Sequence, residues 1–198
     1  VSYRHRIIVE VAADAFRALG QPGTDARSTF TLPSRLIAGV RADIKRYGVA
    51  LDVERGFNSQ NEVSSLAGTV DLFGEVDVAN VFGWQDATTV RAGFEVRAGA
   101  GGRCSARLGY VYDEATSNRA YPTAFGTPAA PTQVLTAGAG YDAGPWAVNL
   151  ALARRTGSTT ITTEDLASGT QDCPFCGATG DYAIDLKGIY VDFRYRMR

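Results

Sequence analysis

The amino-acid sequence predicts an all-β fold, an antiparallel up-and-down transmembrane β-barrel with about eight strands in this chain. Three observations predict it: apolar and polar residues alternate over long segments, short and long connections alternate along the chain, and aromatic residues gather near both ends of the segments. The composition agrees with this fold, because the 198 residues include 22 glycines and one methionine and show few apolar patterns of helical period.

The clearest alternation lies in residues 90–97 and 106–113, which flank a glycine-rich turn at 98–102. The apolar face of this hairpin holds Val90, Ala92, Phe94 and Val96 from the first arm, and Ala106, Leu108, Tyr110 and Tyr112 from the second. The other face carries charged residues within both arms. A soluble sheet with a solvated back shows this pattern, and so does a membrane barrel with lipid outside and a polar lumen.

The remaining segments follow the same period of two, so each is expected to form one strand. They are residues 1–13, 28–42 and 47–54 before the hairpin, and residues 135–141, 146–155 and 184–197 after it. Between residues 56 and 83 the alternation loosens, and we expect strand extensions that stand above the sheet. Ile184 and Leu186 fall on the opposite parity to Ile189, which predicts a β-bulge near residues 187–188.

The connections are sorted by length. Short turns fall at residues 43–46, 98–102 and 142–145, all at one end of the meander, whereas the long loops fall at the other end. Outer-membrane barrels have this arrangement, with short periplasmic turns and long external loops. No run approaches the roughly 18 apolar residues of a membrane helix, so a membrane role has to use strands. Aromatic residues next to the short turns (Tyr47, Tyr141, Trp146, Tyr195) and towards the long loops (Trp84, Tyr112) match two interfacial girdles.

The face opposite the apolar one carries charges of both signs. If it lines the lumen of a barrel, it forms a polar wall that includes Arg41, Asp52, Glu54, Arg91, Glu95, Arg97, Arg107, Asp192 and Arg194. Two interpretations stay open: the wall guides the carboxylate headgroup of a ligand, or its members form cross-strand ion pairs in a wet interior. The total charge is nearly balanced, with 20 Lys and Arg against 21 Asp and Glu, which gives no support for nucleic-acid binding.

The long loops hold further candidate residues. An external hydrophobic groove would form if Phe73, Phe82, Tyr121 and Phe125 converge, and ordinary loop packing is an equally good interpretation. In the last long loop, Cys173 and Cys176 are expected to form a local disulfide, which indicates an oxidising compartment.

Residues for catalysis or for a cofactor are not evident. His5 is the only histidine, and no recognisable motif places a serine beside it, so a serine hydrolase is not expected. One cysteine pair and His5 supply too few ligands for a zinc site. The adjacent carboxylates Glu164 and Asp165 lie in a loop rich in Thr and Gly, where such pairs are usually solvated. We therefore expect no enzyme, no metal site and no cofactor.

Several pieces of sequence follow one another across nearly the whole chain: Leu32-Pro33, Trp84-Gln85-Asp86, Val90-Arg91-Ala92-Gly93, Ala106-Arg107-Leu108-Gly109-Tyr110, Pro131, Leu135-Thr136-Ala137-Gly138-Ala139-Gly140-Tyr141, and a final strand with alternating aromatic residues. In order and spacing they resemble the carboxy-terminal part of the FadL-type outer-membrane transporters, a family that imports long-chain fatty acids and other hydrophobic compounds. The resemblance implies a barrel of 14 strands with an amino-terminal hatch, in which residues 1–198 form a single segment with about the last eight strands. The family's hatch, its asparagine-proline-alanine signature and its kinked early strand have no counterpart here.

The function implied by this resemblance is passive uptake of hydrophobic small molecules, such as long-chain fatty acids or hydrocarbons, through the outer membrane of a Gram-negative bacterium. The implied partners are the lipid bilayer, the hydrophobic ligand, and the missing amino-terminal strands and hatch. Two other classes stay open: a small complete eight-stranded outer-membrane barrel with a structural or adhesive role, and a soluble periplasmic barrel or sandwich that binds lipid. Apolar stripes sealed between two stacked sheets would favour the soluble class.

Overall fold

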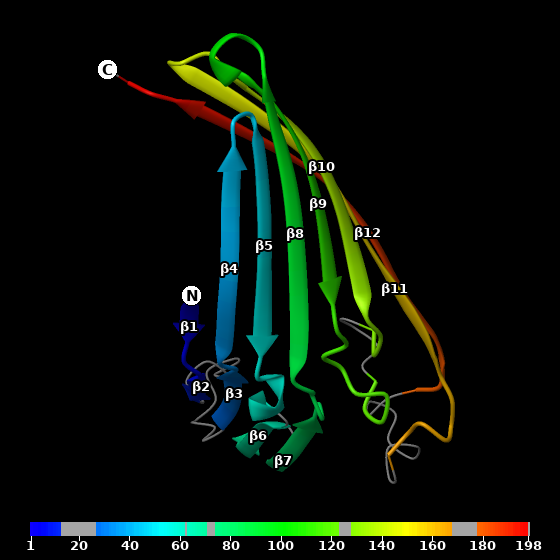
Figure 1. The fold of residues 1–198 in the computed structure, drawn as a ribbon. Coiled ribbons are helices and arrows are strands. Elements are labelled where there is room, and N and C mark those ends of the chain that lie inside the picture. Colours follow the sequence, from blue (N-terminus) through cyan, green and yellow to red (C-terminus); the bar gives the residue numbers. More distant parts are fainter. Residues whose placement is uncertain (13–26, 62, 71–73, 123–127, 168–177, 198) are drawn as a thin grey trace.

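The computed structural model describes residues 1–12, 27–61, 63–70, 74–122, 128–167 and 178–197. Its main feature is an antiparallel sheet of eight strands in the order β1-β4-β5-β8-β9-β10-β11-β12. The bounds of these strands are β1 Ser2–Arg4, β4 Arg35–Ile44, β5 Tyr47–Gly56, β8 Ala87–Ala98, β9 Cys104–Asp113, β10 Thr132–Asp142, β11 Trp146–Ile161 and β12 Gly180–Tyr195. The strands lie side by side and the sheet curves along its length (Figure 1). The predicted all-β antiparallel fold is confirmed, and the described strands form an open sheet.

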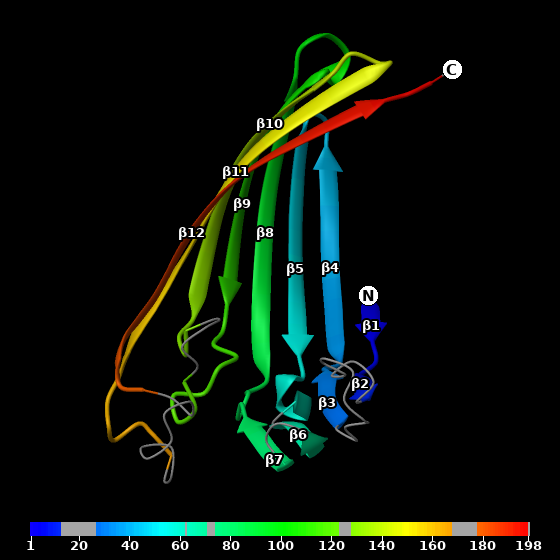
Figure 2. The same cartoon turned by 180° about the vertical axis from the view of Figure 1, so that it is seen from behind.

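A second, four-stranded sheet has the order β2-β3-β6-β7. It consists of β2 Ile7–Ala12, β3 Arg27–Leu32, β6 Val63–Val70 and β7 Gly74–Val81. Both views show it beyond the lower ends of β4, β5 and β8, at the end opposite the short turns (Figures 1 and 2). The hairpin of β6 and β7 agrees with the strand extensions expected for residues 56–83.

The short turns lie together at the other end of the large sheet. Lys45 takes a positive φ of 55° between β4 and β5, and Gly144 takes a φ of 92° between β10 and β11. Between β8 and β9, a 3-10 turn at Ala100–Gly102 contains Gly101 and Gly102 at φ 68° and 70°. Glycine adopts this conformation without steric strain, which explains the short glycine-rich link.

Two of the predicted strands divide between the sheets. Residues 1–13 contain β1 in the large sheet and β2 in the small one, and residues 28–42 contain β3 and β4, so the prediction of one strand for each segment is wrong. Both breaks lie at the same level, because Arg4 Nη2 donates a hydrogen bond to Pro33 O at 3.2 Å. Pro33 has no N–H to donate to a ladder. The N–H of Ser34 instead donates to Gln60 Oε1 at 2.9 Å, so a loop side chain takes the place of a strand partner.

The predicted bulge near residues 187–188 is also wrong. The ladder between β11 and β12 runs without an offset from Trp146 opposite Tyr195 to Ile161 opposite Gly180. Ile184 and Leu186 therefore share the face of the charged residues rather than returning to the apolar face.

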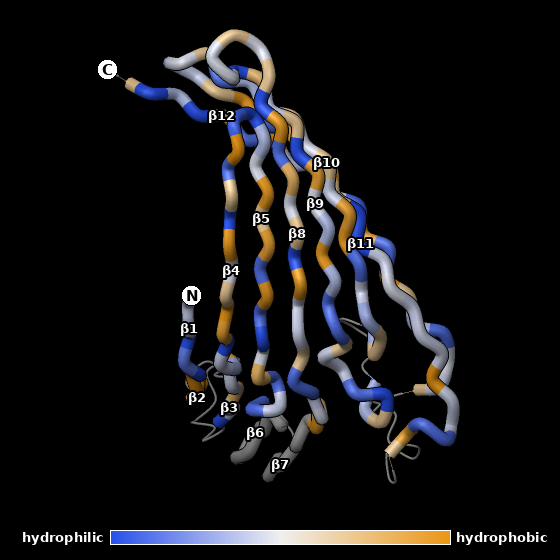
Figure 3. Tube along the Cα trace, viewed as in Figure 1, coloured by the Kyte–Doolittle hydropathy of each residue, from blue (hydrophilic) through white to orange (hydrophobic). Residues whose placement is uncertain are grey.

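The apolar face of the large sheet is exposed, which is the reverse of a soluble sheet. Leu108, Leu135 and Ile189 are 62%, 65% and 73% exposed, whereas Glu54 and Glu95 are 5% and 8% exposed. Hydrophobic and hydrophilic positions alternate along the strands (Figure 3). The described strands therefore do not seal this apolar face in a dry centre between two stacked sheets. No helix of the described residues has the length and apolar character needed to cross a bilayer.

Candidate functional site

The candidate site is the face of the large sheet that carries the charged residues, here called the inner face. Residues directly opposite each other in an antiparallel ladder share a face. Asp52 lies opposite Arg91, and Glu95 lies opposite Arg107. All nine residues of the predicted polar wall (Arg41, Asp52, Glu54, Arg91, Glu95, Arg97, Arg107, Asp192, Arg194) fall on this face by the strand registers. The opposite, apolar face is called the outer face.

Glu95 is the centre of an ion cluster near the short turns. Its carboxylate accepts hydrogen bonds from Arg97 Nε and Arg107 Nε, each at 2.6 Å, and from Arg41 Nη2 at 3.3 Å. Arg41 also makes two hydrogen bonds to Asp43, at 2.9 and 3.0 Å. Glu95 is nearly buried, whereas the arginine side chains are 43–47% exposed, so the centre of the cluster is shielded from water and its edge is solvated.

Glu54 is the centre of a second ion cluster, nearer the long loops. Arg91 donates to Glu54 Oε2 at 2.6 Å and to Asp52 Oδ1 at 2.9 Å. Arg35 binds the other carboxylate oxygen of Glu54. The two clusters join β4, β5 and β8 in addition to their backbone ladders, and the Glu95 cluster also reaches β9.

A polar chain extends from the Glu95 cluster across the remaining strands. Arg107 Nη1 donates to Asn149 Oδ1 at 3.0 Å, and Asn149 Nδ2 donates to Asp192 Oδ2 at 3.0 Å. Gly140 of β10 makes this crossing possible, because a Cβ at that position would lie 2.5 Å from Asn149 Oδ1. Arg194, the last residue of the predicted wall, lies 3.7 Å from the Asp142 carboxylate.

Beside the charged strands lies a set of inner-face positions without charge, here called the uncharged lane. It runs along β9 to β12 and consists of Gly109, Val111, Val134, Thr136, Gly138, Ala151, Ala153, Leu186, Gly188 and Tyr190. Arg155 is the charged neighbour at its end, and it turns towards Asp113 and Thr132, which it binds at 3.1 and 2.8 Å. A hollow of about 460 Å³ lies over the middle of the lane, with Glu95 and Arg107 at its charged side.

The uncharged lane was not predicted from the sequence. Its glycines and alanines stand at the polar parity and carry no signal one by one, and Leu186 was assigned to a bulge. The signal that would have found the lane is the stretch of uncharged residues at the inner parity in the middle of four consecutive strands, in contrast to β4, β5 and β8.

The long-loop end is held by a polar clamp. Arg119 donates to both oxygens of Asp165 at 2.8 and 3.0 Å, to Thr159 Oγ1 and to the Thr160 carbonyl. The guanidinium of Arg119, together with hydrogen bonds from Thr162, holds the pKa of Asp165 far below its usual value. Ile161 packs nearby and is 1% exposed. The loop after β9 is therefore fixed to the projecting end of β11.

Only part of the predicted external groove lies within the described residues. Phe82 and Trp84 stack with ring centroids 4.9 Å apart. Tyr121 lies against the intervening Gly83, where a Cβ would come within 2.6 Å of its ring. Phe73 and Phe125 lie outside the described residues, as do Cys173 and Cys176 of the predicted disulfide.

Tyr3 Oη lies 3.3 Å from Nδ1 of His5. Among the described residues, no three His, Cys, Asp or Glu side chains are placed to hold a metal ion.

Curvature, strand order and an exposed apolar face together define an outer-membrane type of antiparallel β-sheet. No family model and no curated protein matches the chain. Among solved structures, it is similar to a FadL homologue of Pseudomonas aeruginosa, with a TM-score of 0.68 and 15% identity over 96% of this chain and 46% of that one. It is also similar to the CymD monoaromatic hydrocarbon channel, with a TM-score of 0.55 and 18% identity over 87% of this chain and 39% of that one.

These likenesses confirm the FadL-type fold that the sequence motifs predict. The chain spans less than half the length of either solved structure.

Proposed function

We propose that this protein is a passive outer-membrane channel for hydrophobic small molecules. The observation that carries the proposal is the division between the two faces of one sheet: an exposed apolar outer face, and an inner face with a charged side and an uncharged lane. The likeness of the fold to a hydrocarbon channel and to a FadL homologue supports it.

The outer face suits contact with hydrocarbon. For example, four apolar positions follow one another along β11: Trp146, Val148, Leu150 and Leu152. Exposing these side chains to water is unfavourable, and a bilayer removes them from water without a second protein layer. We therefore place the protein in the outer membrane of a Gram-negative bacterium, with the bilayer as its first partner.

The inner face suits passage of a molecule that has little polarity. On the charged side, Glu54 and Glu95 are saturated by arginines, so the ion pairs stabilise the wall rather than bind cargo. A hydrophobic ligand would move along the uncharged lane, where it displaces water from Gly109, Ala151 and their neighbours without breaking an ion pair. Transport of this kind has no covalent step and follows the concentration gradient and the partitioning of the ligand.

The complete pore belongs to the same proposal. We infer that further strands and a hatch close the barrel around the uncharged lane, as the resemblance to the family implies, and that fatty acids or hydrocarbons are the class of cargo. The aromatic cluster of Phe82, Trp84 and Tyr121 would make the first contact with the ligand outside the membrane, together with Phe73 and Phe125.

A pair of matched substitutions tests the uncharged lane. Ala151 faces the inner hollow and Ala137 faces outward on the adjacent strand. In cells that lack their own hydrophobe channel, Ala151→Trp should reduce uptake of a fluorescent long-chain fatty acid to the background rate, while Ala137→Trp should transport like the unchanged protein. Heat-modifiable electrophoretic mobility reports that both variants are folded. A folded Ala151→Trp variant with unchanged uptake would overturn the proposed path.

A further inference from the structure

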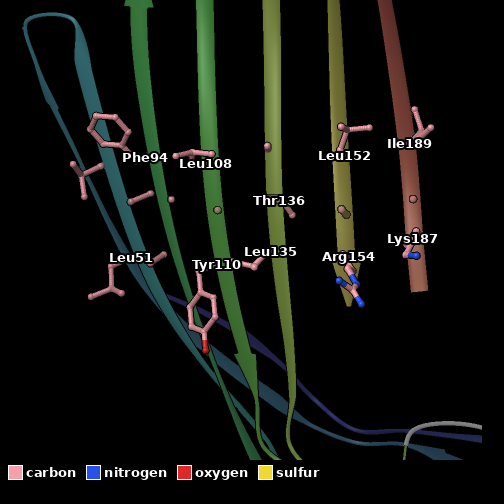
Figure 4. A pocket seen from close by; sticks show the side chains of 18 residues that line it. Leu51, Phe94, Leu108, Tyr110, Leu135, Thr136, Leu152, Arg154, Lys187 and Ile189 are labelled. Atoms are coloured by element: carbon pink, nitrogen blue, oxygen red, sulfur yellow. The ribbon is translucent and has the colours of Figure 1, made fainter. Parts of the chain in front are cut away.

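Two basic residues lie on the outer face of the sheet, on the strands farthest from the amino terminus. Leu135 of β10 is opposite Arg154 of β11, and Arg154 is opposite Lys187 of β12. All three therefore project from the outer face. One step nearer the short turns, Leu152 and Ile189 form the next pair on that face (Figure 4). The proposed function places hydrocarbon there, so the two cations need an explanation.

Their depth places these cations at one boundary of the apolar band. Arg154 lies eight residue steps beyond Trp146, which is next to the short turn, and this corresponds to about 26 Å of strand and about 20 Å across the membrane at a usual tilt. The outer-face positions beyond them, towards the long loops, are Thr156 and Asp185. The cations therefore lie where the headgroups of the leaflet on the long-loop side begin.

The two cations differ in their pairing. Arg154 donates two hydrogen bonds to Asp185, both at 3.0 Å. Asp181 is the other nearby acid, and its carboxylate accepts from Thr160 Oγ1 at 2.7 Å. Lys187 is exposed and makes no ion pair within 4 Å of any residue that the structure describes, and Asp185 attracts it only from a longer distance. A long amine at this level favours an anionic partner in the headgroup layer.

An apolar trough leads to these two cations. A hollow of about 980 Å³ runs over the outer face, with Leu108, Tyr110, Leu135, Leu152 and Ile189 among its lining residues and Arg154 and Lys187 at its end. Figure 4 shows the two basic side chains on neighbouring strands next to Leu152 and Ile189. An apolar trough that ends in positive charge is complementary to a lipid with acyl chains and an anionic headgroup.

We propose that Lys187 and Arg154 bind a phosphate of a phosphorylated, acylated glycolipid of the outer leaflet, and that one of its acyl chains lies in the trough. A phosphate suits the pair, because a guanidinium and an ammonium group both form charge-assisted hydrogen bonds with its oxygens. This inference rests on the proposed function only for the position of the sheet in the outer membrane with its long loops outside.

Native mass spectrometry of the protein in detergent tests the inference with purified lipid A as the probe, in its phosphorylated and its enzymatically dephosphorylated form. The unchanged protein should retain the phosphorylated form preferentially. Lys187→Gln should weaken that retention about five-fold, as expected for one basic side chain near an anionic headgroup. Lys45→Gln, which removes a lysine from a short turn at the other end of the sheet, is the matched control and should change nothing.

Equal retention of the two lipid A forms by the unchanged protein would overturn the proposal, whatever the variants do. So would an equal loss in both variants, or displacement of the lipid by the same concentration of inorganic phosphate or of a long-chain fatty acid. Uptake of a hydrophobic probe into vesicles that contain the same protein separates the two ideas. Normal uptake by a protein with no preference for phosphorylated lipid A would exclude the lipid site alone. Failure of the protein to insert into vesicles would exclude the proposed function.

Discussion

Replacing Leu108 by arginine tests which solvent the outer face contacts. Leu108 is 62% exposed and lies between Phe94 and Ala137 in the middle of the outer face. In a soluble protein, such an exposed position accepts arginine with a change in unfolding free energy within about 0.5 kcal/mol. In a membrane-spanning sheet, the guanidinium would lie near the centre of the hydrocarbon, and we expect a loss of about 2–4 kcal/mol.

The matched control is Gln133→Arg. Gln133 of β10 also projects from the outer face, and it lies opposite Tyr112 of β9. Tyr112 is four residues beyond Leu108, which is about 13 Å along β9. At that depth an arginine reaches the headgroups, so the loss should be no more than about 1 kcal/mol. Urea unfolding of the protein in lipid vesicles, followed by tryptophan fluorescence, measures both values.

The comparison has a clear failing outcome. If Leu108→Arg and Gln133→Arg have equal effects, the outer face does not contact a hydrocarbon layer with a defined depth. A soluble, stable Leu108→Arg variant that needs no lipid or detergent would refute both the membrane position and the channel.

Three further predictions concern the ion clusters and the loops. Glu95→Gln should lower the unfolding free energy in vesicles by about 2 kcal/mol, because three partly exposed arginines lose a shared charged acceptor. Asp192→Asn should lower it by less than about 0.5 kcal/mol. Equal losses in the two variants would contradict a cluster centred on Glu95. Because the pKa of Asp165 is depressed, its contribution to the stability of the clamp is complete above the ordinary carboxyl pKa and is lost only as the pH falls below that value. Hydrogen-exchange protection of the Thr162 amide should therefore be equal at pH 7 and at pH 5, and it should disappear in Asp165→Asn. A loss of protection between those two pH values would contradict the clamp. Serine at both Phe82 and Phe125 should weaken binding of a hydrophobic probe without changing barrel assembly, measured by fluorescence titration and electrophoretic mobility, and unchanged binding would exclude the external groove.

The period of two predicted most of the large sheet, because alternation reports which residues share a face. It did not report which sheet a segment joins. Residues 1–13 keep the same alternation on both sides of His5, yet β1 pairs with β4 and β2 pairs with β3. Strand partners depend on contacts between distant residues, such as the one between Arg4 and Pro33, and a local pattern does not contain them.

The candidate site shows the same limit. Alternation identified Glu54 and Arg91 as inner-face residues, but their ion pair joins positions 37 residues apart and depends on the register of β5 against β8. The bulge prediction failed for a related reason. Leu186 was assumed to face lipid because it is apolar, whereas it belongs to the inner face opposite Arg155.

That inner-face leucine also bears on how the proposed channel could have a charged wall and still admit a hydrophobic molecule. A guanidinium without a partner would hold water in the bore and would raise the free energy of an apolar ligand beside it. The structure instead pairs the charges of β4, β5 and β8 with one another and with Arg107, and along the middle of β9 to β12 it leaves small or apolar residues such as Gly109, Ala151 and Leu186. The ion pairs add side-chain links across the strands, so the uncharged lane needs no charge for its stability and, in the proposed channel, is free to contact the ligand.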